Sequence, residues 1–531
     1  MSEHPDKHGG YSLAQAVREA YSQGQTDYNL EPLVRVGMDG QPIGQIQDGD
    51  TVIFCCRRGE REIELTEAFT SVEFSHFNRP QLQNLNFIIL TLYHEKFVNL
   101  PVAFAPSKVN STLGEAISKA GLTQLRCSES EKFAHITFFL NGGTNEPFPG
   151  ESRVRIPSPK GVPFDQMPEL SLPAVADEVI KGLETGYDCI ITNFANGDVI
   201  GHTASAEAKI RCAEVVDEHL GRVIEAASEQ GYVVLITADH GNLEEMLTPD
   251  GKPNVAHTTN LVPFLFIDPL TSQTIQPADG SLQDIAPTLL NILGVPVPVE
   301  ITGSTLLPKQ YFNDKRRVLL IILDGWGIGK ADPTNPIHLA NTPVWDKLVV
   351  NYHPSQLQAS GEHVGLQPGK AGNSEAGHMN IGAGRVILQD DVRLDQAIKD
   401  GTFAKNEVFQ KAMESTLEQN KRLHLLGLLT EKSSHGSIDY PLALLRLAKE
   451  KGLEDVYLHL ILDGRSTEPG SAPALLEKLE GWMAEIGVGQ VVSAVGRGIA
   501  LDRDGNYAKI QRAYDSLVLG LGNHYSTQDG M

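Results

Sequence analysis

Residues 317–327 read RVLLIILDGWG, an unbroken apolar run that ends abruptly at an aspartate. Three other segments share this pattern: DCIITNFANGD at 188–198, YVVLITADHGN at 232–242 and VYLHLILDGR at 456–465. Runs of five to eight Val, Ile and Leu residues, separated by segments of helical period, are typical of buried parallel strands. The sequence therefore predicts an α/β fold with a mainly parallel central sheet, whose ligands gather at the carboxyl ends of the strands.

Segments of helical periodicity lie between these runs. Helices are expected at 13–23, 112–120, 204–228, 283–293, 404–420, 441–451 and 473–485. The polar, turn-rich stretch 301–316 precedes an apolar strand, and we interpret it as a linker. A chain of 531 residues is too long for one ordinary core, so more than one domain is expected.

The composition excludes several classes of protein. Lys and Arg total 44 against 67 Asp and Glu, and a net charge of −23 opposes binding to nucleic acid or to an anionic membrane. Five cysteines without CxxC spacing indicate neither a disulfide framework nor a thiolate metal site. The sequence shows no signal peptide and no run of about 18 apolar residues. We expect a cytoplasmic protein that acts on a small molecule.

Carboxylate and imidazole side chains recur where the apolar runs end. They are Asp198, His202, Asp239, His240, His257 and Asp324. Asp198 and His202 are four residues apart, which places both on one face if the segment is helical. A single aspartate after a strand is more often a turn or capping residue, but these residues together converge on one edge of a sheet. The set, which lacks thiolates, suits Mn²⁺, Zn²⁺ or Mg²⁺ at a hydrolytic or phosphoryl-transfer site.

Ser374 is the candidate nucleophile, within KAGNSEAGHMNIG at 370–382. A serine at the start of a helix presents its hydroxyl to the positive end of the helix dipole, where a phosphate or alkoxide is favoured. The alternative is that Ser374 only caps the helix, because serine followed by an acidic residue is common there. The spacing leaves both interpretations open.

Five motifs together resemble a known family: LDGWG at 323–327, GNSEAGH at 372–378, NFANGDVIGH at 193–202, TADHGN at 237–242 and AHTTNLVPF at 256–264. They are similar to the metal and nucleophile motifs of the 2,3-bisphosphoglycerate-independent phosphoglycerate mutases, in the alkaline phosphatase superfamily. The resemblance covers nearly the whole chain. It implies an alkaline-phosphatase-like three-layer sandwich with a mainly parallel central sheet, plus a second α/β transferase domain.

The motifs stand in a different order from the family's, because segments that usually close the chain come first here. This order resembles a circular permutation in which 301–316 joins the usual ends. The resemblance then implies a contiguous phosphatase domain at 106–387. The transferase domain is expected to be split between 1–105 and 388–531.

The resemblance also implies a set of site residues. One metal would be held by Asp198, His202 and His257, and the other by Asp324, Ser374, Asp239 and His240. Two divalent cations are expected, with Mn²⁺ favoured over Zn²⁺ or Mg²⁺. The phosphoryl group would pass to Ser374, the glycerate would reorient, and the group would return to the other hydroxyl.

Substrate-binding residues carry over less completely. Those implied are Lys132, Arg58, Arg61, His435, Arg465, Arg497 and Arg503. Clustered guanidinium groups are what a carboxylate and a phosphate require. Ser437 replaces a second histidine of the family, and Ser466 replaces an aspartate that handles the substrate hydroxyl. Glu468, two residues on, could substitute for that aspartate.

The leading expectation is a monomeric isomerase of glycolysis and gluconeogenesis that interconverts 3-phosphoglycerate and 2-phosphoglycerate. The departures at Ser437 and Ser466 leave open a phosphatase or phosphomutase acting on another small phosphate ester. A third hypothesis, a non-catalytic metal-binding relative, is disfavoured because all seven metal-site residues are present.

Overall fold

The computed structural model describes residues 6–57, 59–106, 109–271, 275–308, 315–431, 433 and 435–526. The chain divides into two compact units. The first consists of Met1–Pro106 and Arg393–Met531, and the second is Ser107–Val392. The sequence placed these boundaries at 105/106 and 387/388. Of the predicted linker 301–316, residues 309–314 lie outside the described part.

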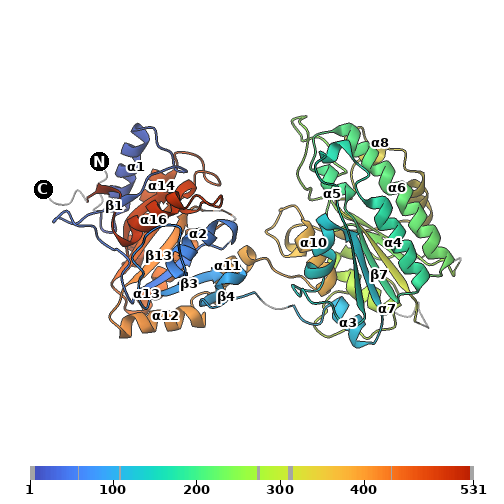
Figure 1. Cartoon of the computed structure of the whole chain (residues 1–531), viewed down its shortest axis with the longest axis horizontal. Coiled ribbons are helices and arrows are strands. Elements are labelled where there is room, and N and C mark those ends of the chain that lie inside the picture. Colours follow the sequence, from blue (N-terminus) through green and yellow to red (C-terminus); the bar gives the residue numbers. More distant parts are fainter. Residues whose placement is uncertain are drawn as a thin grey trace. The chain divides into compact units, whose positions relative to one another are not determined.

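The first unit is built around a sheet assembled from both ends of the chain (Figure 1). Its strand order is β16-β1-β15-β14-β13-β2-β3-β4. The strands are β1 Leu33–Arg35, β2 Thr51–Cys55, β3 Asn86–Thr91, β4 Val102–Phe104, β13 Leu423–Leu429, β14 Val456–Leu462, β15 Gln490–Gly496 and β16 Asn523–Tyr525. All neighbouring pairs are parallel except β1 with β15.

Helices cover both faces of this sheet. They are α1 Gly10–Ser22, α2 Gly59–Thr70, α11 Asp390–Lys399, α12 Glu407–Glu418, α13 Asp439–Lys451, α14 Ala472–Ile486, α15 Arg497–Ala500 and α16 Tyr507–Val518. Neighbouring strand residues point to opposite faces, so Leu425 lies in the core beneath α13 and α14. Leu426 lies in the separate core beneath α2 and α16. The continuous apolar runs are thus explained by burial on both sides.

The second unit has its own sheet, ordered β10-β12-β9-β8-β11-β7-β5-β6. The strands are β5 Gln124–Glu129, β6 Glu151–Ile156, β7 Cys189–Phe194, β8 Val233–Thr237, β9 Val262–Ile267, β10 Gly280–Ser281, β11 Val318–Leu323 and β12 Ser355–Gln358. Only β9 runs antiparallel to its neighbours, β8 and β12. The helices are α3 Leu113–Lys119, α4 Leu172–Thr185, α5 Asn196–Gly201, α6 Ala206–Glu229, α7 Ile285–Ile292, α8 Pro336–Leu339, α9 Pro343–Tyr352 and α10 Ser374–Ala383.

This second sheet is also covered on both faces. Leu125 of β5 lies against Gly182 of α4, whereas the next residue, Arg126, lies against Gly114 of α3. Because successive side chains of a strand point in opposite directions, α3 and α4 cover opposite faces. In Figure 1, α10 lies on one side of this sheet and α4 with α6 on the other. The predicted three-layer α/β architecture is confirmed.

The four quoted apolar runs form β7, β8, β11 and β14, as predicted. The seven expected helices correspond to α1, α3, α6, α7, α12, α13 and α14. The sequence analysis did not anticipate α2, α4, α9 or α16. Among the described residues, no helix has the length and hydropathy to cross a membrane.

Candidate metal centre

Three neighbouring parallel strands deliver carboxylates to one edge of the second unit's sheet. In the order β8-β11-β7, Asp239 follows β8, Asp324 follows β11, and Asp198 lies on α5 just after β7. The turn after Asp324 needs glycine, because Gly325 has φ 74° and a Cβ there would lie 2.7 Å from the Asp198 backbone nitrogen. The strand order therefore places the three carboxylates together, as the sequence predicted.

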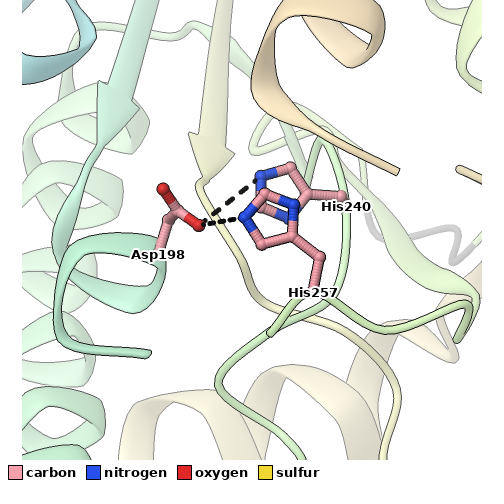
Figure 2. Close-up of side chains that lie close together, drawn as sticks. All are labelled: Asp198, His240 and His257. Atoms are coloured by element: carbon pink, nitrogen blue, oxygen red, sulfur yellow. Dashed lines mark ion pairs between the residues drawn. The ribbon is translucent and has the colours of Figure 1, made fainter. Parts of the chain in front are cut away.

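Imidazoles surround Asp198 Oδ1. His257 Nε2 lies 3.0 Å from it, His202 Nε2 3.2 Å and His240 Nε2 3.7 Å. His257 comes from the loop that leads into β9; because β9 is antiparallel to β8, this loop lies at the same edge of the sheet. Figure 2 shows His240 and His257 directed at the Asp198 carboxylate.

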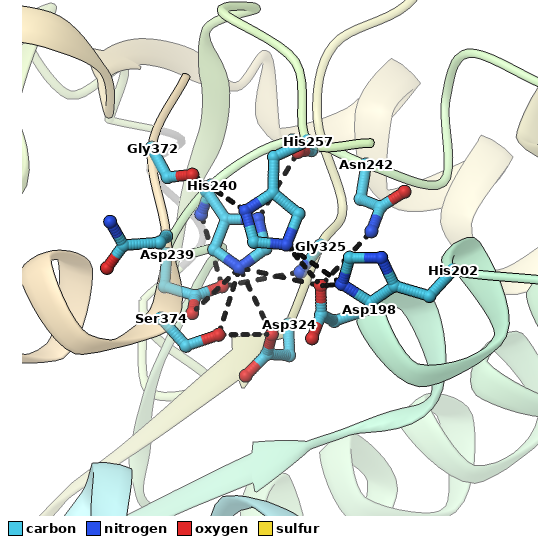
Figure 3. A network of polar contacts seen from close by, with 12 residues as sticks. Asp198, His202, Asp239, His240, Asn242, His257, Asp324, Gly325, Gly372 and Ser374 are labelled. Atoms are coloured by element: carbon cyan, nitrogen blue, oxygen red, sulfur yellow. Dashed lines mark hydrogen bonds and ion pairs between the residues drawn. The ribbon is translucent and has the colours of Figure 1, made fainter. Parts of the chain in front are cut away.

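Two groups of side chains have ligand atoms close enough to share a cation. One is Asp198, His240 and His257, and the other is Asp239, His240 and Asp324. The sequence had assigned His202 rather than His240 to the first metal, and His202 Nε2 lies 3.0 Å from His257 Nε2. Figure 3 shows both groups joined in one polar network with Ser374.

Ser374 is the first residue of α10, and its hydroxyl faces the carboxylate edge. Ser374 Oγ lies 3.0 Å from His240 Nε2 and 3.2 Å from Asp324 Oδ1. The helix is capped by Asn373, whose side-chain oxygen accepts a hydrogen bond from the Ala376 amide. The capping alternative for Ser374 is therefore wrong, and its hydroxyl remains available for chemistry.

Lys132 lies inside the same cluster, although the sequence had assigned it only to substrate. Its Nζ donates to Asp198 Oδ2 at 2.6 Å, Asp324 Oδ1 at 2.8 Å and Ser374 Oγ at 2.6 Å. Burial opposes the charge of Lys132, but the carboxylates of Asp324 and Asp198 outweigh it and raise the lysine pKa. The residue is thus a fixed ammonium beside the candidate nucleophile.

The hydrogen-bond partners of the histidines indicate which ring nitrogen could bind a metal. His202 Nδ1 faces the Val255 carbonyl at 2.8 Å and His257 Nδ1 faces the Gly372 carbonyl at 2.7 Å. A carbonyl only accepts, so each Nδ1 carries a proton, and Nε2 is the nitrogen that faces the Asp198 carboxylate. The hydrogen bond to Asp198 raises the pKa of His202. A carbonyl on Nδ1 is also the supporting contact typical of a histidine that binds a metal through Nε2.

The charge of the cluster supports the same conclusion. Three carboxylates are nine-tenths or more buried, and among the described residues Lys132 is the permanent cation hydrogen-bonded to them. Burial lowers the pKa of His240, but the Asp239 carboxylate raises it, and the net pKa is about 9. Burial raises the pKa of Asp239, but His240 lowers it, and the net pKa lies below the usual value. A buried surplus of negative charge with oxygen and nitrogen donors fits divalent metal ions.

His378 and Asn193 belong to this site and were missed by the sequence analysis. His378 Nδ1 lies 2.8 Å from the Ser374 carbonyl and 3.3 Å from Asp239 Oδ2. Asn193 donates to Asp324 Oδ2 at 2.7 Å and lies 3.0 Å from His378 Nε2. The spacing of four residues between Ser374 and His378 was a signal for one helix face. Asn193, buried in β7, carried no such signal.

The remaining predicted substrate residues belong to the first unit. His435 and Arg497 are buried near the carboxyl ends of β13 and β15. Arg497 forms an ion pair with Asp463, and Arg61 donates to the Leu501 carbonyl at 3.0 Å. Arg465 is exposed, with its guanidinium 5.1 Å from the centre of the Tyr28 ring. Arg503 is exposed as well, and Arg58 lies outside the described residues.

The residues that depart from the family pattern have local partners. Ser466 Oγ bonds Ser433 Oγ at 3.2 Å, and Ser437 Oγ donates to Asp439 at 3.1 Å. Glu468, the suggested substitute for an aspartate, is exposed. None of these contacts identifies a group in the first unit that would take the proton of a substrate hydroxyl.

Comparison with known proteins gives two family matches. Residues 36–297 match the metalloenzyme superfamily. Residues 394–530 match the family described as the BPG-independent PGAM N-terminus. A segment described as an N-terminus thus follows the metalloenzyme segment in this chain.

Curated relatives are similar over part of their length. The chain is 45% identical over 303 residues to a 2,3-bisphosphoglycerate-independent phosphoglycerate mutase of Moorella thermoacetica, covering 57% of this chain and 58% of the relative. Corresponding proteins of Desulforudis audaxviator and Methanosarcina acetivorans are 46% and 44% identical, each over 56% of this chain and over 58% and 56% of the relative. A solved Leishmania mexicana phosphoglycerate mutase is 28% identical, with TM-score 0.39 over 51% of this chain and 53% of that one. The chain thus spans between half and three-fifths of the relatives it matches.

Proposed function

Because residues 36–297 match the metalloenzyme superfamily and residues 394–530 match the BPG-independent PGAM N-terminus, we propose that the chain is a 2,3-bisphosphoglycerate-independent phosphoglycerate mutase. It would interconvert 3-phosphoglycerate and 2-phosphoglycerate through a phosphoserine at Ser374. The observation that carries the proposal is the Ser374 hydroxyl, which lies within 3.2 Å of Lys132 Nζ, His240 Nε2 and Asp324 Oδ1. The identity of the relatives supports the choice of substrate.

Ser374 is set up to act as a nucleophile. The Lys132 ammonium favours the alkoxide over the hydroxyl, and the start of α10 adds the positive end of a helix dipole. Asp324 Oδ1 accepts a hydrogen bond from the hydroxyl at 3.2 Å and is the proton acceptor beside it. When Ser374 Oγ bonds to phosphorus, the bond from phosphorus to the glycerate oxygen breaks. In the return step the other glycerate hydroxyl attacks, and Ser374 leaves.

Two divalent cations are proposed, with Mn²⁺ favoured. Asp198, His202 and His257 would hold one, and Asp239, His240, Asp324 and Ser374 would hold the other. When bound, such cations neutralise charge that develops on the transferring phosphoryl group. The supporting observation is that His202 Nε2 and His257 Nε2 face Asp198 Oδ1 while a carbonyl accepts from each Nδ1.

The substrate's carboxylate and hydroxyls would be bound by residues of the first unit. The proposed residues are Arg58, Arg61, His435, Arg465, Arg497 and Arg503, with Lys132 of the second unit on the phosphate. Guanidinium groups suit a carboxylate because they can donate two parallel hydrogen bonds. The proposed domains are 1–105 with 388–531 for substrate and 106–387 for the metals.

The order of the matches supports a circularly permuted arrangement. The segment described as an N-terminus lies at 394–530, behind the metalloenzyme segment at 36–297. A permuted chain can align with its relatives in one order over only part of its length. This accounts for alignments of 297–303 residues in a chain of 531.

A second candidate is a phosphatase or phosphomutase for another small phosphate ester. Ser466, which bonds Ser433 in place of presenting a carboxylate, favours it. The two candidates share the metal centre and differ in the substrate.

An enolase-coupled assay with 3-phosphoglycerate and Mn²⁺, without 2,3-bisphosphoglycerate, tests the proposal. We expect turnover by the parent and a loss of at least about 10³-fold in Ser374→Ala, since the nucleophile is removed. Ser118→Ala is the matched control, because among the described residues the Ser118 hydroxyl bonds only the Pro149 carbonyl, at the surface. A parent with bound metal that turns over other phosphate esters but not 3-phosphoglycerate would favour the second candidate.

A further inference from the structure

A buried glutamate contacts His435 near the carboxyl ends of β2 and β13 in the first unit. Glu62 lies on α2 and is 0% exposed, and its Oε1 is 3.1 Å from His435 Nδ1. A bridge between Cys56 and Gly436 holds the loop that carries His435 against the end of β2. The bridge therefore fixes the loop of His435 beside the end of β2, and Glu62 reaches His435 from α2.

The contact sets the protonation pattern of the imidazole. An ionised carboxylate only accepts hydrogen bonds, so Glu62 in that form holds the proton on His435 Nδ1, and Nε2 of the neutral ring then presents a lone pair. Among the described residues, Nε2 has no hydrogen-bond partner, and the side chain is 10% exposed. His435 thus offers one basic nitrogen toward the accessible side.

The second oxygen of Glu62, Oε2, is buried and has no hydrogen-bond partner among the described residues. Burial raises the pKa of Glu62, while His435 and Arg497 oppose that shift; Cys56 and Tyr93 are the other titratable groups that face it. A fully buried carboxylate with one unpartnered oxygen costs stability, which points to a functional use.

The neighbouring groups at this edge are poor proton acceptors. Asp463 is paired with Arg497 through Oδ1, and its Oδ2 accepts from the Ser466 amide at 3.3 Å. Ser433 and Ser466 present hydroxyl groups, which do not take protons near neutral pH. Among these groups, His435 Nε2 is the nitrogen that remains as a candidate base.

We propose that Glu62 is a positioning residue that holds His435 with Nδ1 protonated, so that Nε2 takes the proton of a substrate hydroxyl. In this step the oxygen–hydrogen bond of the glycerate breaks, the oxygen keeps the electron pair, and the proton moves to Nε2. The inference rests on the proposed function, because it names the base for that substrate. The inference gives a role to the Glu62 carboxylate, which lies far from the proposed metal ligands in the sequence.

Ring-nitrogen NMR of the metal-loaded protein, labelled with ¹⁵N-histidine, tests the positioning directly. The His435 signals are assigned by their loss in His435→Gln. We expect the Nδ1-protonated tautomer in the parent and its loss or mixing in Glu62→Gln, because the amide can donate as well as accept. Glu64→Gln is the matched control: Glu64 is another buried glutamate of α2, and it bonds the Gly505 amide at 2.9 Å.

Steady-state kinetics give the second readout. We expect kcat of Glu62→Gln to fall on the order of 10²-fold with KM changed less than about 3-fold, because a general base contributes in the transition state. A parent that carries mainly the Nε2-protonated tautomer would overturn the positioning without any variant. A Glu62→Gln protein that keeps both the parental tautomer and the parental kcat would also overturn the positioning role. A correct tautomer in a parent inactive on phosphoglycerate would instead overturn the proposed function and its proton transfer.

Discussion

Replacing Lys132 by methionine removes the ammonium from the buried carboxylate cluster while keeping a side chain of similar length. In the metal-free protein, Asp198 and Asp324 then lose their charged partner. Removing one partner of a buried ion pair costs about 3–5 kcal/mol. At about 2 °C per kcal/mol for a large domain, the unfolding temperature of the second unit should fall by about 6–10 °C.

The pH range in which Lys132 stabilises the fold follows from its raised pKa. A lysine whose folded pKa exceeds its unfolded value contributes stability that is fully present below about pH 10.4 and is lost as pH rises through the folded value. At pH 7.5 the whole contribution is therefore measurable.

Differential scanning calorimetry in EDTA at pH 7.5 makes this measurement on the parent and Lys132→Met. Lys181→Met is the matched control, because Lys181 is an exposed partner of Glu178 at 3.4 Å. Added Mn²⁺ should narrow the difference, since cations then offset the carboxylates. Equal unfolding temperatures in EDTA, within about 2 °C, would refute the role assigned to Lys132.

Three further predictions concern other parts of the chain. His459 is buried, and burial lowers its pKa well below the usual value, so the unfolding free energy should fall as pH drops below about 6.5; urea titrations at pH 7.5 and 5.5 measure this. Arg497→Met strands the buried Asp463 carboxylate and should destabilise the first unit by about 3–5 kcal/mol in the same titration; an unchanged midpoint would contradict it. Gly377→Ala places a Cβ 2.6 Å from the Asp239 carbonyl, so kcat should fall at least about 10-fold with the fold retained by circular dichroism.

Local patterns in the sequence were sufficient to predict that carboxylates and imidazoles gather at one edge of the sheet. The apolar runs that became β8 and β11 lead directly into candidate ligands, so strand period and strand-end chemistry together located Asp239 and Asp324. The four-residue spacing of Asp198 and His202 was realised around α5, at 3.2 Å. Such features depend on residues close together in the chain.

Contacts between distant segments were beyond the reach of sequence patterns. Glu62 and His435 are 373 residues apart in the sequence, and Lys132 and Ser374, which share a hydrogen bond, are 242 residues apart. Each contact depends on strand order, which hydrophobic periodicity does not encode. The helix cap was ambiguous for a similar reason: Asn373 and Ser374 are both good capping residues, and only the backbone geometry assigns the cap to Asn373.

The central claim is that Ser374 becomes covalently phosphorylated. Acid quenching of the Mn²⁺-loaded protein during turnover of 3-phosphoglycerate, followed by peptide mass spectrometry, measures this directly. The account predicts one added phosphoryl group on the peptide that contains Ser374, and none in Ser374→Ala. Turnover without any phosphate on that peptide, or phosphate on another residue in both proteins, would contradict it.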